Sequence, residues 1–486
     1  MAILCIDAGT TLIKSVLFDE NGKELLVASR ATYVLNPAPG LSEQDMNEVW
    51  QSVVETCSEI LAQTNLPIEA ISVTAQGDGA WMIDGTGDPV RNAVLWNDGR
   101  ASVEIDNWEN EDLLDKAFRI NGSLTSLGLP NAIIKWFSKN DSVALQKTSS
   151  VLTCGSWIYF KLTGVIGQHI SEASAPWVDI ASKSISTELI ELYGLTEFAE
   201  KIPPVLTDPQ SPLSLQASSE LGIPAHTPVV MSPYDILATA TGCGAIADSE
   251  AFVILGTTIC PGIVINSVDL TGEAAGLNLV TGENNTYLRA LPTLTGTSAL
   301  TWVMETLAYS TVDELGKAAA TAQPGAGGVT LLPYFSGAGE RAPFLDSRAQ
   351  ASFHGLSSDT TREDIARSVY EALAHVIREC LETTKTPITQ LAISGGGARS
   401  DFWCQLIADV VGVPTSRTSD TQVGAKGALM YASVAIGKFP SLSNAAKVLV
   451  SQSETFTPKP DLIDFYTIQQ KNFISLRKMS QQSWSI

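Results

Sequence analysis

Apolar runs at the start of the chain predict three short strands. Residues 2–6 and 12–18 are apolar runs on either side of a glycine-containing turn, and a third run covers 25–34 after Asn21-Gly22. Because Asn-Gly between apolar runs favours a two-residue hairpin of type I′, we expect these strands to be antiparallel neighbours.

Helical and strand-like patterns alternate along the rest of the chain, which indicates an α/β fold with helices on both faces of a sheet. After a strand that ends at Leu255, apolar runs repeat the opening pattern. Periodicity predicts these further elements: strands at 70–74, 259–265, 286–291, 329–332 and 391–394, and helices at 46–61, 362–383 and 401–411. Since 486 residues exceed what one hydrophobic core usually organises, we expect two domains, 1–245 and 246–486.

Composition narrows the classes of function. Hydrophobic residues make up 44% and charged residues 17%, as in a compact soluble protein. The net charge of −22 argues against a nucleic-acid partner, which would need clustered Lys and Arg. No apolar run is long enough for a membrane helix, and the seven cysteines form no C-x-x-C pair. We therefore expect a cytoplasmic protein without a membrane partner. The sequence leaves the oligomeric state open, a homodimer included.

Gly-Thr-Thr follows an apolar run in each half, at Gly9-Thr10-Thr11 and at Gly256-Thr257-Thr258. Glycine lets the backbone approach a polyphosphate closely, and turn amides and threonine hydroxyls can donate hydrogen bonds to its oxygens. Asp7, at the mouth of the first turn, could hold a hydrated Mg²⁺ against them. Either turn alone is equally explained as an ordinary tight turn. The repetition in matching context favours two like-folded halves around one nucleotide.

Glycines also mark a candidate adenosine site. Gly395-Gly396-Gly397 lies between a predicted strand and a helix that Ser400 or Asp401 could cap. Such a segment can lie flat against a planar base or ribose, although tight helix packing is the alternative explanation. A dinucleotide fingerprint fits this segment poorly, so a nicotinamide oxidoreductase is a weak alternative.

Asp235 follows an apolar strand and precedes small residues. A carboxylate at such a strand end could accept the proton of a hydroxyl that attacks a γ-phosphoryl group, whereas capping of the next helix is the competing reading. Two polar segments could bind the acceptor's hydroxyls, Gln76-Gly77-Asp78-Gly79 and the loop with Trp96, Asp98 and Arg100. Each could also be an ordinary surface loop.

Ordered motifs along most of the chain resemble those of the FGGY carbohydrate kinases. Asp7-Ala8-Gly9-Thr10-Thr11 resembles the family's first phosphate motif, Leu255-Gly256-Thr257-Thr258 its second, and the segment 394–400 its adenosine motif. Ala351 to Leu356, continued through Asp364-Ile365 to Glu371, is similar to the C-terminal family signature.

The resemblance implies an α/β fold of two ribonuclease H-like domains, of the sugar kinase, actin and Hsp70 type, with ATP in the cleft between them. It implies Asp235 as the catalytic base and Asp7 with Asp235 as ligands of Mg²⁺. The acceptor set it implies is Gln76, Asp78, Trp96, Asp98, Arg100 and Asp235. The ATP-binding set we predict is Gly9, Thr10, Thr11, Lys14, Gly256, Thr257, Thr258, Gly395, Gly396, Gly397 and Ser400.

The segments 75–79 and 339–344 resemble the erythritol and L-xylulose kinase branch of that family. We therefore expect an ATP-dependent kinase whose acceptor is a short polyol or ketopentose with a terminal hydroxyl. The alternative from another class is an ATP-binding sugar sensor or actin-like scaffold without phosphotransfer.

Overall fold

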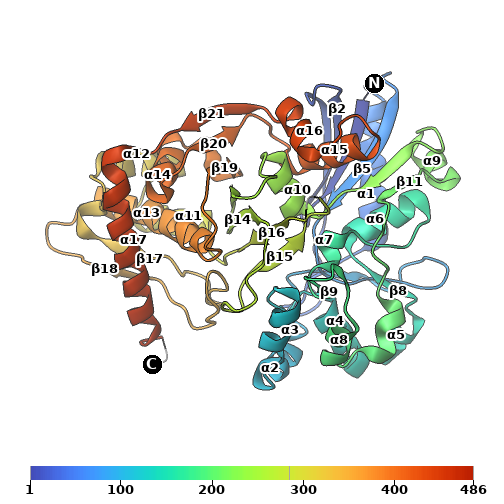
Figure 1. Ribbon diagram of the computed structural model, residues 1–486, viewed down its shortest axis with the longest axis horizontal. Coiled ribbons are helices and arrows are strands. Elements are labelled where there is room, and N and C mark those ends of the chain that lie inside the picture. Colours follow the sequence, from blue (N-terminus) through green and yellow to red (C-terminus); the bar gives the residue numbers. More distant parts are fainter. Residues whose placement is uncertain (1, 284, 485–486) are drawn as a thin grey trace.

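The chain forms two large mixed sheets, one in each half of the sequence (Figure 1). The computed structural model describes residues 2–283 and 285–484. The first sheet has the strand order β11-β12-β5-β1-β2-β3 and the second has the order β15-β16-β14-β13-β19-β20-β21. Their strands are β1 (Ala2–Ala8), β2 (Leu12–Asp19), β3 (Glu24–Ala31), β5 (Ile68–Ala75), β11 (Gln210–Pro212), β12 (Pro228–Met231), β13 (Glu250–Leu255), β14 (Ile259–Ile265), β15 (Leu277–Val280), β16 (Tyr287–Ala290), β19 (Gln390–Ser394), β20 (Thr415–Thr418) and β21 (Gln452–Phe456).

The two sheets repeat one pairing scheme. In the first, β1 pairs antiparallel with β2 and parallel with β5, and β5 pairs parallel with β12. In the second, β13 pairs antiparallel with β14 and parallel with β19, and β19 pairs parallel with β20. The strand patterns that the sequence repeats are therefore two copies of one sheet topology, as predicted.

The first hairpin differs from its prediction. Gly22 has φ 79° but Asn21 has no positive φ, so the turn is not of type I′, which needs both. The Asp19 N–H donates to the carbonyl of Lys23, which closes a three-residue loop with Gly22 in the left-handed region. The Asp19 carboxylate accepts N–H bonds from Asn21 and Lys23 at 2.9 Å, and these bonds fix this wider loop.

Helices predicted from periodicity begin and end close to the expected residues. Helix α1 is capped by Asp45, α13 by the capping box of Thr361 with Asp364, and α14 by Ser400. The α-helices are α1 (Met46–Leu61), α2 (Ser102–Asn110), α3 (Leu113–Asn121), α4 (Pro130–Asn140), α5 (Ser142–Lys147), α6 (Cys154–Thr163), α7 (Ile170–Ala173), α8 (Thr187–Leu192), α9 (Leu215–Leu221), α10 (Asp235–Gly242), α11 (Thr297–Thr306), α12 (Val312–Thr321), α13 (Arg362–Glu382), α14 (Asp401–Val411), α15 (Val423–Ala435), α16 (Leu442–Leu449) and α17 (Pro460–Gln481).

Shorter elements complete the chain between these helices and sheets. Four two-stranded sheets pair β4 (Glu43–Gln44) with β7 (Ala93–Val94), β6 (Trp81–Ile83) with β8 (Ser150–Leu152), β9 (Val178–Asp179) with β10 (Ser184–Ile185), and β17 (Thr330–Leu332) with β18 (Ser352–His354). The 3₁₀ helices are η1 (Thr196–Lys201), η2 (Ala326–Gly328) and η3 (Gly396–Arg399). In the described part of the chain, no helix is both long and apolar enough to cross a membrane.

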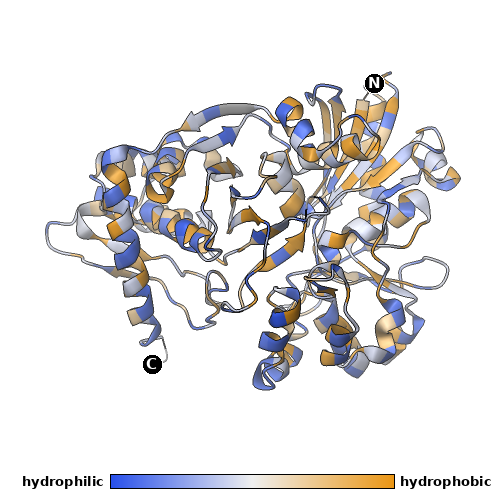
Figure 2. Ribbon diagram, viewed as in Figure 1, coloured by the Kyte–Doolittle hydropathy of each residue, from blue (hydrophilic) through white to orange (hydrophobic). Residues whose placement is uncertain are grey.

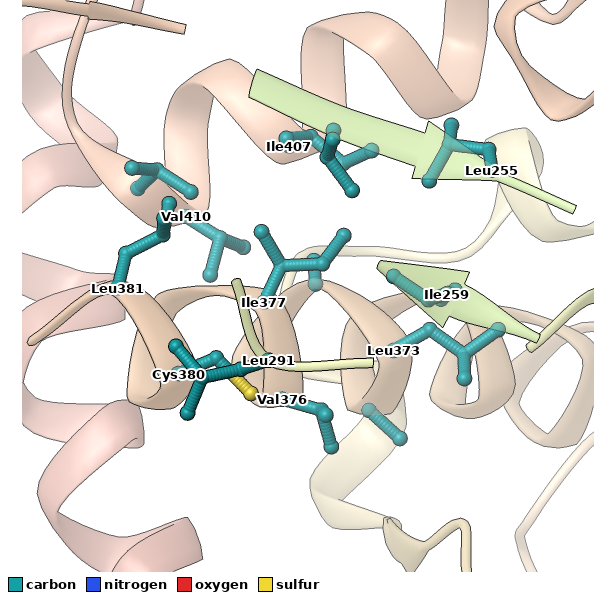
Figure 3. Packing of buried hydrophobic residues seen from close by; sticks show 14 of the residues in the cluster. Leu255, Ile259, Leu291, Leu373, Val376, Ile377, Cys380, Leu381, Ile407 and Val410 are labelled. Atoms are coloured by element: carbon teal, nitrogen blue, oxygen red, sulfur yellow. The ribbon is translucent and has the colours of Figure 1, made fainter. Parts of the chain in front are cut away.

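Each sheet has its own hydrophobic core. In the second half, Leu373 and Ile377 of α13 pack against Leu255 and Ile259 of the sheet (Figure 3). Fully burying an aliphatic side chain contributes about 1.5–3 kcal/mol, so such layers hold the strands that carry the site loops. Figure 2 shows hydrophobic residues gathered along the strands of the first sheet, while α17 alternates hydrophilic and hydrophobic residues.

Helices α10 and α15 each pack against the sheet of the other half of the chain. Helix α10 lies at the end of the first half, yet its Leu237 packs in a cluster with Phe252 of the second sheet. Helix α15 lies late in the sequence, yet its Leu429 packs in a cluster with Ile3 of the first sheet, and α15 and α16 lie beside that sheet in Figure 1. The domain division at 245/246 stays a prediction. Helices α10 and α15, which pack against each other, connect the two sheets.

Candidate active site

A cavity of about 430 Å³ lies between the two halves. The first half contributes residues from the ends of its central strands, and the second half contributes the turn after β13 and the loop that contains Arg341. Its lining includes Thr10, Gln76, Gly77, Asp78, Trp96, Ser126, Tyr234, Asp235, Gly256, Thr257, Thr258, Cys260, Pro292 and Arg341.

The two Gly-Thr-Thr turns meet at this cavity. In the first turn the Gly9 N–H donates to the carbonyl of Leu12 at 3.0 Å, and in the second the Gly256 N–H donates to the carbonyl of Thr258 at 3.1 Å. Among the described residues, the amides that follow each glycine (Thr10, Thr11, Thr257 and Thr258) have no hydrogen-bond acceptor. Four free amide donors therefore remain for an anionic ligand.

Asp7 lies at the end of the first sheet, next to the beginning of α15. A Cβ on Gly424 would lie 3.2 Å from a carboxylate oxygen of Asp7, so glycine is what lets the helix approach so closely. Burial raises the pKa of Asp7, and the charge of Lys14, its partner across β1 and β2, opposes that rise. Lys14 thus lies beside the first turn, as the prediction requires.

Asp235 is the first residue of α10, and no side chain caps this helix. Burial raises the pKa of Asp235 to about 8, and the neighbouring charge of Asp7 adds to the rise. The charges of Asp78 and Glu172 act in the same direction, while a backbone hydrogen bond from Ile236 opposes it. A carboxylate with such a pKa binds a proton more readily than an exposed one.

The Gly395 segment borders the second turn. Gly395 has φ 89°, and a Cβ there would lie 2.7 Å from the carbonyl oxygen of Leu255. Gly397 lies against the ring of Trp403, whereas Gly396 has an open face. The Ser400 hydroxyl accepts the N–H of Trp403, so it caps α14 as predicted. Gly395 and Gly397 thus lie against Leu255, the residue before Gly256, but the three glycines do not line the cavity itself.

Thr10 is bonded to the predicted acceptor residues. Its hydroxyl donates to Gln76 Oε1 at 2.7 Å and accepts the indole N–H of Trp96 at 2.9 Å. Gln76 donates to Gln44 at 2.9 Å, and Gln44 donates to the carbonyl of Thr10 at 2.7 Å. This closed ring fixes Gln76 and the half-exposed Trp96 against the first turn.

Asp98 and Arg100, the other predicted acceptor residues, lie outside the cavity lining. Both are buried, and neither lines the cavity. The Arg100 guanidinium donates to Asp98 at 2.7 Å and to Glu43 at 2.7 Å, while Asp98 also accepts the N–H of Ser42. The structure therefore does not bring this pair to the other acceptor residues, because their charges are satisfied by one another and by Glu43.

Two family models together match residues 2–436. The N-terminal domain of the FGGY family of carbohydrate kinases matches residues 2–242, and the C-terminal domain matches residues 236–436. The chain belongs to the FGGY family of carbohydrate kinases. It is therefore an ATP-dependent carbohydrate kinase, and the predicted fold class is confirmed.

Relatives and solved structures named as sugar or polyol kinases match most or all of the chain. A protein named erythritol kinase from Brucella abortus is 29% identical over 466 residues, which cover 91% of this chain and 89% of the relative. A probable L-xylulose kinase from Haemophilus influenzae is 26% identical over a match that covers 88% of this chain and 89% of the relative. The crystal structure of a xylulose kinase from Lactobacillus acidophilus has a TM-score of 0.93 at 22% identity and covers 100% of this chain and 99% of its own.

Three polar residues of this FGGY kinase site were not among the predicted site residues. Glu172, on α7, accepts hydrogen bonds from Thr153 and from Ser156 (3.0 Å), and burial raises its pKa to about 7. Tyr234 and Arg341 line the cavity. Glu172 has no motif around it that could have revealed it, whereas Tyr234 precedes Asp235 and Arg341 lies in the segment 339–344 that resembles the family.

Two carboxylates of the site, Asp7 and Asp235, are the candidate ligands of a metal ion. No group of three or more His, Cys, Asp or Glu side chains that could hold a metal ion occurs in residues 2–283 and 285–484. Asp7 and Asp235 fit Mg²⁺ nonetheless, because this ion keeps most of its waters and needs only one or two carboxylates. Their mutual repulsion, which raises the pKa of Asp235, is what a bound cation would relieve.

Proposed function

We propose that this FGGY kinase transfers the γ-phosphoryl group of ATP to a terminal hydroxyl of a four- or five-carbon polyol or ketose. The observation that carries the proposal is the single cavity lined by both Gly-Thr-Thr turns, Asp78 and Asp235. The relatives named erythritol kinase and L-xylulose kinase support a short, neutral acceptor. A cavity of about 430 Å³ suits an acceptor of that size.

In the proposed mechanism Asp235 is the general base. As the acceptor hydroxyl attacks, its oxygen forms a bond to the γ-phosphorus, the bond from that phosphorus to the β-γ bridging oxygen breaks, and the proton passes to Asp235. The free amides of the two turns donate to the oxygens of the transferring group. Closure of the halves would exclude water from the cavity.

Asp7 and Asp235 are the proposed ligands of Mg²⁺. When bound, the ion would neutralise charge on the phosphate oxygens of ATP. Lys14, beside Asp7, would add positive charge near the first turn. For the nucleoside we propose the Gly395 to Gly397 segment, because it is open at Gly396 and adjoins the second turn.

For the acceptor we propose direct contacts with Gln76, Asp78 and Trp96. Asp98 and Arg100 would act indirectly. The Arg100 guanidinium pairs with both Asp98 and Glu43, and Glu43 directly precedes Gln44 of the Thr10 ring of hydrogen bonds. The seven cysteines are all buried and free, which supports a cytoplasmic location as part of this proposal.

A panel of C3 to C6 polyols and ketoses, assayed for ADP release and for the phosphorylated product, tests the proposal. We expect turnover with a C4 or C5 acceptor, and we expect Asp235→Asn to lower kcat by about 10²-fold or more. If the protein binds MgATP but phosphorylates no acceptor of the panel, the sensor alternative is favoured. Near wild-type turnover by Asp235→Asn would remove Asp235 from the role of base.

A further inference from the structure

Arg341 is the one positively charged residue that lines the cavity, among the residues that the structure describes. It reaches the cavity from the second half, opposite Asp78 from the first half. Its Nε–H donates to the carbonyl of Pro292 at 3.0 Å, whereas its two terminal nitrogens have no acceptor among the described residues. The guanidinium is therefore anchored at one edge and keeps its outer N–H donors for a ligand.

The loop around Arg341 is held firmly. Glu340 is 2% exposed, and its carboxylate accepts the N–H of Leu294 at 2.7 Å and the N–H of Arg341 at 2.9 Å. Gly339 has φ 76°, and a Cβ there would lie 2.2 Å from the carbonyl oxygen of Asp346. These contacts set the direction of the side chain before any ligand binds.

Asp78 is held equally firmly on the other side. It has φ 58°, which is rare for a residue other than glycine. On one side Gly77 lies so close to the ring of Tyr234 that a Cβ would be 2.4 Å from it, and on the other the Gly79 N–H donates to the carbonyl of Gly128 at 2.8 Å. Burial raises the pKa of Asp78 to about 7, and the charge of Arg341 opposes that rise, so the two groups lie close together.

We propose that Arg341 and Asp78 together determine acceptor specificity as a charge pair that binds two adjacent oxygens of a neutral sugar or polyol. The ionised Asp78 can only accept from a hydroxyl, and Arg341 can only donate to a hydroxyl or keto oxygen. This inference rests on the proposed function and names the substrate class of the same site: neutral acceptors with vicinal oxygens.

The pair also filters acceptors by charge. A sugar acid carries a carboxylate that suits Arg341 as a bidentate partner. Asp78 and Asp235 line the same cavity as Arg341, so a carboxylate there would meet two acidic groups and the wild-type site should reject it. If Asp78 lost its charge, Arg341 would become free to bind a carboxylate.

The test is a set of four variants, Arg341→Gln, Arg341→Lys, Asp78→Asn and Asp78→Asn/Arg341→Gln. Each is assayed with a neutral acceptor that the wild type phosphorylates and with an aldonate such as gluconate, and binding is followed in parallel by ligand-induced thermal stabilisation. We expect Arg341→Gln to raise the acceptor KM about 10-fold or more with the KM for ATP within about twofold, and Arg341→Lys to recover part of the loss.

For the aldonate we expect no stabilisation of the wild type, stabilisation of Asp78→Asn, and loss of that gain in the double variant. Arg348→Gln is the matched control, since this arginine lies in the same loop outside the cavity. An acceptor KM unchanged in Arg341→Gln, or an Asp78→Asn variant without aldonate binding, would overturn the inference. If the wild type phosphorylates no neutral acceptor, the proposed function is overturned instead. The thermal-stabilisation measurements with the aldonate would still decide the role of Arg341.

Discussion

At the scale of single residues, the site gathers negative charge that the fold does not neutralise. Burial raises the pKa values of Asp235, Asp78 and Glu172, and the charges of Asp78 and Glu172 add to the rise at Asp235. Arg341 is the one cation in the cavity lining of the described chain. Such a cluster destabilises the ligand-free protein, and it makes sense as a site organised for a cation and a proton transfer.

The first consequence concerns the pH dependence of stability. The pKa of Asp235 is about 8 in the folded protein against 3.8 for an ordinary Asp, so the folded state keeps a proton that the unfolded state releases. Stability contributed by this group is therefore lost as pH rises between about 4 and 8. Asp235→Asn should exceed the wild type in stability at pH 9 by on the order of 1 kcal/mol or more, with little difference at pH 4.

Thermal unfolding midpoints of both proteins, measured without nucleotide and with a chelator, check this expectation. A difference of the same size at pH 4 and pH 9 would show that Asp235 does not carry the proton. Asn occupies the same volume as Asp, so packing is not disturbed by the substitution.

The second consequence concerns Tyr234. Tyr234 lines the cavity and is 4% exposed, and its buried hydroxyl has no hydrogen-bond partner among the described residues. Removing an unsatisfied hydroxyl leaves stability unchanged or slightly higher. If the hydroxyl binds the acceptor, Tyr234→Phe should lower kcat/KM for the acceptor about 10-fold, the value of one hydrogen bond.

Steady-state kinetics with each substrate varied in turn, together with the unfolding midpoint, tests Tyr234→Phe. A fall in the unfolding midpoint without a change in acceptor kinetics would assign the hydroxyl a structural role instead.

The candidate site shows where sequence reasoning reaches its limit. Thr10 and Asp235 could be predicted because each lies just after an apolar strand, and that pattern is local in the sequence. Whether Asp98 reaches the cavity could not be predicted, because its carboxylate is bound by Arg100 and by the N–H of Ser42, which lies far away in the sequence. Arg341 could not be placed either, since only the folded chain brings it opposite Asp78.

At the scale of elements, the helix pair α10 and α15 determines how the two sheets join. A Cβ on Gly427 would lie 1.8 Å from the carbonyl oxygen of Ala238, and one on Gly242 would lie 2.0 Å from that of Val423. Glycine at these positions allows backbones to touch where Asp235 begins one helix and Gly424 brings the other to Asp7. The packing of these helices therefore sets where Asp235 lies relative to Asp7, the other proposed metal ligand.

Gly427→Ala should force these helices apart. Alanine improves intrinsic helix propensity by about 1 kcal/mol, but overpacking against a backbone carbonyl costs about 1–3 kcal/mol, so we expect net destabilisation. We also expect kcat to fall, because Asp235 shifts with α10. Unfolding midpoints and kcat are compared with those of Gly85→Ala, whose added Cβ meets nothing within 4 Å. Equal stability of the two variants would show that the helix contact is not tight.

The local pattern of apolar and capping residues predicted most helices and strands well. It predicted less well which distant elements pack against them. Helices 46–61 and 401–411 agree with α1 and α14 because capping residues and apolar periodicity act within one segment. The antiparallel pairing of the first hairpin is confirmed, but its type I′ turn was wrong: the Asp19 side chain accepts bonds from the turn amides, which the Asn-Gly pair alone does not reveal. That α15 packs on the first sheet follows from contacts across the whole chain, which periodicity does not contain.

At the scale of the whole molecule, two like sheets joined by exchanged helices form one cavity between them. A ligand that touches both Gly-Thr-Thr turns bridges the halves and should stabilise the molecule as a unit. The chain carries 52 acidic against 30 basic residues, so ATP approaches a protein of like charge. The amides of the turns and a divalent cation must overcome that repulsion at the site.

Binding of ATP should therefore depend on the divalent cation. We expect MgATP at 100 times its Kd to raise the free energy of unfolding by about 2.7 kcal/mol, and ATP with excess chelator to raise it far less. Mg²⁺ with NAD is the control, because a nicotinamide enzyme would be stabilised by that pair. The midpoint of thermal unfolding is measured in all three mixtures. In the Asp7→Asn variant, the midpoints with MgATP and with chelated ATP should differ less than in the wild type. Equal stabilisation with and without the cation would show that the turns alone hold the nucleotide, and that Asp7 and Asp235 have no metal to bind.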